Sequence, residues 1–135
     1  MRTKETAYLF ARLSMGVNFL LHGLVRFPKL QGFKDWMLGY FKDSLLPLWS
    51  VEIWASILPF LEFGIGLLLI IGLCTKKTII LGSSVIIVLI IGSCLKENWE
   101  WVSFQMIYSL YFFLLLIYYK YNHYSIDRYI KKDKE

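Results

Sequence analysis

Two ionisable residues lie deep within long apolar segments of the sequence and are the first candidates for chemistry. Arg12 lies in the first apolar run, and Glu62 lies in the second. An ionisable group in hydrocarbon costs free energy, so such residues usually pair with each other or mark a functional site. Glu52, nearer the outer end of the second run, is expected to pair with a basic residue such as Arg26 or to meet water. At about 1.5 Å of helix rise per residue, Arg12 and Glu62 would lie at similar depths. We therefore predict an Arg12–Glu62 pair, either as a clamp between helices or as a site that binds a polar headgroup or exchanges a proton.

Polar residues expected near Glu62 suggest a binding site for a carbonyl-bearing molecule. Asn18 and His22 lie one helical turn apart in the first apolar run, and Gln105 and Tyr108 lie in the last one. Side chains of these types suit the carbonyl oxygens of a quinone, and they suit hydrogen bonds between helices equally well. The candidate ligand-binding residues are therefore Arg12, Asn18, His22, Glu62, Gln105 and Tyr108, and none is assigned a catalytic role.

The sequence contains no residue pattern typical of thiol, haem or metal chemistry. Cys74 and Cys94 flank the third apolar run, so helix geometry separates them by roughly 25 Å or more. A disulfide needs a Cα separation of about 4.4–6.8 Å. His22 and His123 belong to opposite ends of the predicted bundle, which argues against a bis-histidine haem. We predict no metal site and no intrinsic cofactor, and we expect the chain not to be a complete redox enzyme on its own.

Four apolar segments must position these residues. Of the 135 residues, 57% are hydrophobic and 19% are charged, and most charged residues gather between near-continuous apolar runs. A transmembrane helix needs about 20 mostly apolar residues to cross the bilayer. The sequence therefore predicts an all-α membrane protein, an antiparallel four-helix transmembrane bundle, as a single domain over residues 1–135. The predicted spans are residues 8–25, 51–73, 78–95 and 102–119.

The connection between the first two spans is long enough to form a helix of its own. Apolar residues recur in it at helical spacing, at Leu30, Phe33, Met37 and Phe41, and the pattern stops before Pro47. This spacing predicts a short amphipathic helix that lies in the membrane interface. An irregular loop anchored by aromatic residues is the alternative.

Basic residues outside the spans predict the orientation. The N-terminal segment, the connection between spans 2 and 3 and the tail carry nine Lys and Arg residues, the opposite side carries five, and Arg12 lies within a span. The positive-inside rule therefore predicts that both termini are cytoplasmic. The tail over residues 120–135 is expected to be partly disordered beyond Arg128. The formal net charge of +5 suits anionic lipid headgroups rather than nucleic acid, because the basic residues flank apolar spans.

Short motifs in four stretches match a known family pattern. The stretches are ARLSMGVNFLLHGLVRFPKLQGF in the first span and the following loop, LPFLEFGIGLLLIIGLCTKK in the second span and its turn, QMIY in the last span, and YNHYSID after it. Together they resemble the DoxX family of small bacterial membrane proteins, over roughly residues 8–128. Where this chain has Arg12, His22, Gly23, Lys29 and Glu62, family members tend to show a basic residue, a polar or glycine pair, a lysine and a glutamate.

The resemblance implies an accessory membrane component of a redox or oxidative-stress system in the bacterial cytoplasmic (inner) membrane, usually without an assigned reaction. We expect a lipid-soluble ligand around Glu62, with a quinone as the candidate cofactor. The expected partners are membrane lipids and a redox partner protein, and nucleic acid is not expected. Formation of a homo-oligomer is possible on this interpretation. The alternative is a non-enzymatic membrane scaffold or assembly factor for a partner protein. Transport of a small solute or lipid is a third interpretation, which four spans would support only in a dimer.

Overall fold

The computed structural model describes residues 2–133 of the chain, and all the secondary structure in this range is helical. Four of its helices are long and apolar enough to cross a membrane, the first of them within the segment Thr3–Tyr40. These are α1 (Thr3–Leu24), α3 (Leu48–Ile71), α4 (Thr75–Leu95) and α5 (Trp99–Ile117). The predicted all-α membrane bundle is confirmed. Each helix begins a few residues before its predicted span, because residues that flank an apolar run can still continue the helix.

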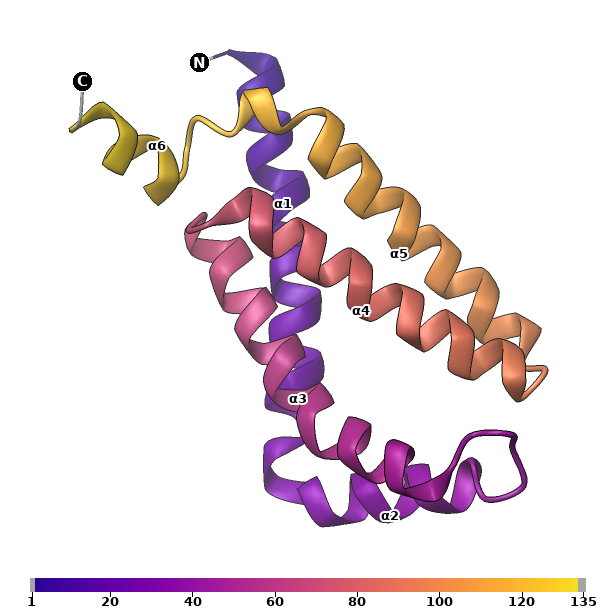
Figure 1. Cartoon of the computed structure of the whole chain (residues 1–135). Coiled ribbons are helices and arrows are strands. Elements are labelled where there is room, and N and C mark those ends of the chain that lie inside the picture. Colours follow the sequence, from indigo (N-terminus) through magenta and orange to yellow (C-terminus); the bar gives the residue numbers. More distant parts are fainter. Residues whose placement is uncertain (1, 134–135) are drawn as a thin grey trace.

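The four long helices form two pairs that diverge from a common end. α1 packs along α3 and α4 packs along α5, whereas α3 and α4 separate beyond the turn that joins them (Figure 1). We call the end with this turn and both termini the terminal end, and the opposite end the α2 end. The bundle is therefore antiparallel, as predicted, and it is open between its two halves.

Glycines allow the close packing of α1 against α3. A Cβ atom on Gly66 would lie 2.6 Å from the carbonyl oxygen of Gly16, and one on Gly23 would lie 2.6 Å from the backbone nitrogen of Phe63. Distances this short exclude any larger side chain without movement of the backbone. Small residues at such a crossing let two membrane helices approach closely and gain van der Waals contact. The α1–α3 pair is thus a tightly packed unit.

The connection between α1 and α3 contains the predicted amphipathic helix, which is confirmed as α2 (Leu30–Tyr40) after a short 3-10 turn, η1 (Phe27–Lys29). α2 lies across the end of the bundle (Figure 1) and packs on the start of α3 through buried Met37 and Phe41. Tyr40 reaches the other helix pair, where its hydroxyl accepts a hydrogen bond from Asn98 Nδ2 at 2.9 Å. Its ring lies 5.1 Å from that of Trp101. α2 therefore bridges the two diverging pairs.

The tail folds back onto the terminal end instead of becoming disordered beyond Arg128, so that prediction is wrong for the described part of the tail. After a short 3-10 turn, η2 (Tyr119–Tyr121), the chain forms α6 (Ile126–Lys132). The Ser125 hydroxyl accepts the first backbone hydrogen bond, from Arg128, at 3.3 Å. The Asp127 carboxylate accepts hydrogen bonds from the backbone nitrogens of Cys74 and Thr75 at 2.6 and 2.7 Å. Residues 134 and 135, which the same prediction covered, lie outside the described residues.

Candidate functional site

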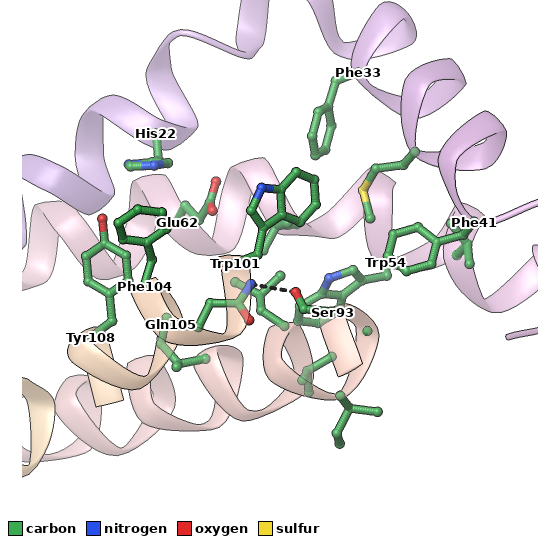
Figure 2. A pocket seen from close by; sticks show the side chains of 18 of the residues that line it. His22, Phe33, Phe41, Trp54, Glu62, Ser93, Trp101, Phe104, Gln105 and Tyr108 are labelled. Atoms are coloured by element: carbon green, nitrogen blue, oxygen red, sulfur yellow. Dashed lines mark hydrogen bonds between the residues drawn. The ribbon is translucent and has the colours of Figure 1, made fainter. Parts of the chain in front are cut away.

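A cavity of about 580 Å³ lies where the two helix pairs diverge, and α2 covers one side of it. Figure 2 shows aromatic side chains from three elements around it, among them Phe33 of α2, Trp54 of α3, and Trp101 and Phe104 of α5. Its walls are mostly apolar, and a few polar groups converge on it. Size and lining of this kind are typical of sites that bind a small lipophilic molecule.

An ion pair between Arg26 and Glu62 forms part of the cavity wall. Glu62 lies in the middle of α3 and is 5% exposed, and Arg26 follows the end of α1. The guanidinium also lies over the ring of Phe33, 4.3 Å from its centroid. Gly23 helps to make the pair, because it lets the backbone of α3 approach α1 one turn before Arg26. The charge of Glu62 is thus compensated within an apolar wall, as buried ionisable groups require.

The predicted pair between Arg12 and Glu62 is wrong. Arg12 is 2% exposed and donates to Asn122 Oδ1 and, at 2.8 Å, to the carbonyl oxygen of Tyr124. It lies beside Gly72, which is ten residues beyond Glu62 and so about 15 Å further along a helix. The estimate of depth assumed that α3 begins level with the end of α1, whereas Gly23 near the end of α1 lies beside Pro59 and Phe63 in the middle of α3. Of the six predicted ligand-binding residues, Arg12 alone does not line the cavity.

Two predicted residues of α1, Asn18 and His22, line the cavity near Glu62. His22 Nδ1 lies 2.7 Å from the carbonyl oxygen of Asn18, one turn earlier. In a neutral imidazole this contact places the proton on Nδ1, which leaves Nε2 as a hydrogen-bond acceptor. A neutral imidazole can therefore accept a hydrogen bond from a hydroxyl group at Nε2. A protonated imidazole donates hydrogen bonds from both nitrogens.

The two predicted residues of α5, Gln105 and Tyr108, line the cavity from the other helix pair. Gln105 Nε2 donates to the Ser93 hydroxyl of α4 at 2.9 Å, the hydrogen bond drawn in Figure 2. Its Oε1 atom is buried without a hydrogen-bond partner. An unpaired buried acceptor costs about 1–3 kcal/mol, so a ligand that offers a donor here would gain by satisfying it.

Arg26 is the site residue that the sequence interpretation missed, since it was assigned to Glu52. In the structure Glu52 lies 3.9 Å from Lys34 of α2, and both side chains are partly exposed. A signal for Arg26 was present, because it shares one helical face with Phe19 and Gly23. That face packs against α3, so a residue that follows it at the α2 end can reach a carboxylate in the middle of α3.

The arrangement can hold and orient a lipophilic molecule with a polar head. Arg26 supplies donors, Glu62 supplies acceptors, and the Gln105 amide supplies either kind, since its oxygen and nitrogen can exchange places by rotation. Within residues 2–133 no group of three His, Cys, Asp or Glu side chains comes together as a metal site would need.

Comparison with known proteins gives one family match. A family model described as DoxX matches residues 7–95, which is well over half of the chain and includes most of α1 and all of α2, α3 and α4. No curated protein and no solved structure gives a significant match to the chain. Gln105, Tyr108 and the tail lie beyond the matched range. Four apolar helices of membrane-spanning length, together with this match, identify a multi-pass membrane protein: the chain belongs to the DoxX family.

Proposed function

We propose that the protein binds a quinone, or a lipophilic molecule with a quinone-like head, in the cavity between its two helix pairs. It would serve as an accessory subunit of a redox system in the bacterial inner membrane, with a partner protein that carries the redox cofactor. The observation that supports this proposal is the cavity itself. It is apolar and about 580 Å³ in volume, and the Arg26–Glu62 pair and the unpaired Gln105 oxygen lie in its wall.

The polar groups suit both redox forms of such a head. A quinone carbonyl accepts hydrogen bonds, and Arg26 supplies donors for it. A quinol hydroxyl donates, and Glu62 and Gln105 Oε1 supply acceptors. Buried polar atoms usually have partners, and a ligand hydroxyl would supply one for Gln105 Oε1. The site therefore fits a ligand whose oxygens change between acceptor and donor.

Tryptophan fluorescence provides the test, because a quinone bound in the cavity would quench the tryptophans that line it. Trp36, Trp54 and Trp101 line the cavity, whereas Trp49 and Trp99 do not. We use the Trp49→Phe/Trp99→Phe variant in lipid nanodiscs and titrate menaquinone and ubiquinone. We expect saturable quenching, and we expect Glu62→Gln to weaken it about tenfold, the loss of one hydrogen bond to a charged group.

The matched control is Glu52→Gln, which removes a carboxylate that lies outside the cavity wall and should leave the titration unchanged. Quenching that rises linearly with quinone, without saturation, in every variant would contradict the proposal. A protein that retains no quinone but repeatedly purifies with one partner would instead favour the assembly-factor alternative.

A further inference from the structure

The cavity has a polar side and an aliphatic side, and the two sides belong to different helices. Most polar groups come from α1, α3 and α5, where Asn18, His22, Glu62 and Gln105 line the wall, and α4 contributes Ser93 near its end. The wall formed by the middle of α4 contains only aliphatic side chains, at Ile86, Val88, Leu89 and Ile91. A molecule that fills the cavity therefore meets polar partners on one side and hydrocarbon on the other.

Part of the aliphatic side of the cavity is exposed at the surface of α4. α3 and α4 are joined at the terminal end and diverge towards the α2 end (Figure 1). Val88 and Ile91 line the cavity, yet they are 42% and 52% exposed. Both side chains therefore reach from the cavity wall to the outer surface of the bundle.

The opposite seam, between α1 and α5, is less suited to a hydrocarbon chain. Near the terminal end it is closed by two tyrosine hydroxyls, which donate across it: Tyr8 to the carbonyl oxygen of Leu115 and Tyr111 to that of Ala11, both at 2.8 Å. Towards the α2 end the polar residues Asn18 and His22 line this side. Polar groups beside a hydrocarbon chain would lose hydrogen bonds without compensation.

We propose that the ligand is a long-chain amphiphile whose head lies against Arg26, Glu62 and Gln105, and whose hydrocarbon chain leaves between α3 and α4, over Val88 and Ile91, into the bilayer. This inference rests on the proposed function and specifies the shape and the route of its ligand. Exchange would take place sideways with the membrane and not through the water-exposed end, which α2 covers.

A blocked exit should discriminate between ligands with and without a chain. Transfer of a chain from lipid to an apolar protein surface changes the free energy little, because both are hydrocarbon-like. Closing the gap, however, forces a long chain to bend or to remain outside. A head without a chain needs no exit, so its affinity depends on the polar wall alone.

The test uses Val88→Trp and Ile91→Trp, each of which fills the gap with a large ring. Ile87→Trp is the matched control, since Ile87 is 55% exposed on the same helix and does not line the cavity. The probes are a long-chain ubiquinone and the same dimethoxy-methyl-benzoquinone head without a chain. Retention per protein is measured in nanodiscs of fixed lipid content, and each probe is compared only with itself across variants, so that partitioning into lipid cancels.

We expect both gap variants to bind the long-chain probe at least about tenfold more weakly and the chain-free head as wild type does. Ile87→Trp should match wild type for both. Equal losses for the two probes, or no loss for either, would overturn the proposed route while the wild-type binding still upholds the proposed function. If wild type retains neither probe above empty nanodiscs, both proposals fail. Equal unfolding temperatures of the variants establish that the folds are comparable.

Discussion

At the scale of single residues, two arginines of the first helical segment have separate tasks. Arg26 compensates Glu62 in the cavity wall, whereas Arg12 is buried at the terminal end and holds the tail through Asn122 and the Tyr124 carbonyl oxygen. Arg26 is paired with a carboxylate, whereas the hydrogen bonds of Arg12 go to two neutral oxygen atoms. The consequences of losing them should therefore differ: one affects the ligand, the other the attachment of the tail.

Replacement of Arg12 should release the tail. In Arg12→Met the alkyl volume is largely kept, but two hydrogen bonds from a charged group are lost, so we expect the free energy of unfolding to fall by about 3 kcal/mol. Denaturant unfolding in mild detergent measures this loss. Limited trypsin digestion should show faster cleavage after Lys120 and Arg128, since both side chains are already exposed and the backbone around them loses its folded contacts once the tail detaches.

Arg2→Met is the control for Arg12, because the Arg2 side chain is 84% exposed and lies 3.4 Å from Glu5. An exposed ion pair contributes at most about 1 kcal/mol, so stability and the cleavage rate should stay near wild type. If Arg12→Met were as stable as Arg2→Met, the contacts of the guanidinium with the tail would not hold it in place.

The sequence could place most of the site but not its pairings. Depth along a helix follows from residue number, and Asn18, His22, Glu62 and Gln105, which were expected at similar depths, all line one cavity. The partner of Glu62 depended instead on how closely α1 and α3 cross and on the turn after α1. Neither follows from periodicity, and the wrong arginine was chosen for that reason.

At the scale of the helices, the α1–α3 crossing depends on the absence of side chains at three positions. Gly16, Gly23 and Gly66 lie where the two backbones approach, and an added Cβ atom at any of them would overlap the opposite helix. Gly64, on the same helix as Gly66, has no atom within 4 Å of an added Cβ atom. This contrast separates the packing role of glycine from its low helix propensity.

Gly66→Ala and Gly64→Ala therefore form a matched pair. We expect Gly66→Ala to lower the free energy of unfolding by about 2 kcal/mol, because overpacking forces the helices apart. Gly64→Ala should leave stability unchanged or raise it by up to about 1 kcal/mol, since alanine favours the helix. Unfolding by denaturant titration in detergent, monitored by circular dichroism, measures both. Equal effects of the two substitutions would show that the crossing is not tightly packed.

The long helices and α2 were predictable from the sequence, whereas α6 was not. Long apolar runs and the spacing of Leu30, Phe33 and Met37 were enough for the spans and for α2. The helix at the end of the tail was missed although Ile126, Tyr129 and Ile130 recur at helical spacing, because four of its seven residues are charged. Its position depends on Asp127 and on the turn at Cys74, which are 53 residues apart in the chain. Such a contact between distant residues cannot be predicted from the local sequence.

At the scale of the whole molecule, two tightly packed helix pairs meet at the terminal end and leave the cavity where they diverge. The termini and the α3–α4 turn share that end, and α2 covers the other. Lys and Arg residues are more numerous at the terminal end than at the α2 end, so we propose that the terminal end faces the cytoplasm.

Labelling of single cysteines tests this orientation. Cys94→Ser leaves Cys74, which is exposed at the terminal end. A variant without either native cysteine and with Asp43→Cys places a thiol at the α2 end, where Asp43 is exposed. In intact cells a membrane-impermeant maleimide should label the thiol at position 43, and it should reach Cys74 only after the membrane is opened. The reverse result would invert the proposed topology.

The contact between Asp127 and the start of α4 also has a consequence for the order of synthesis. The first backbone N–H groups of a helix have no partner within it, and here those of Cys74 and Thr75 are satisfied by a carboxylate made 53 and 52 residues later. While the chain is still emerging from the ribosome, α4 must enter the membrane with this end uncapped. The turn between the two helix pairs therefore acquires its final hydrogen bonds among the last steps of folding, after the cavity-lining residues of all four long helices have been translated.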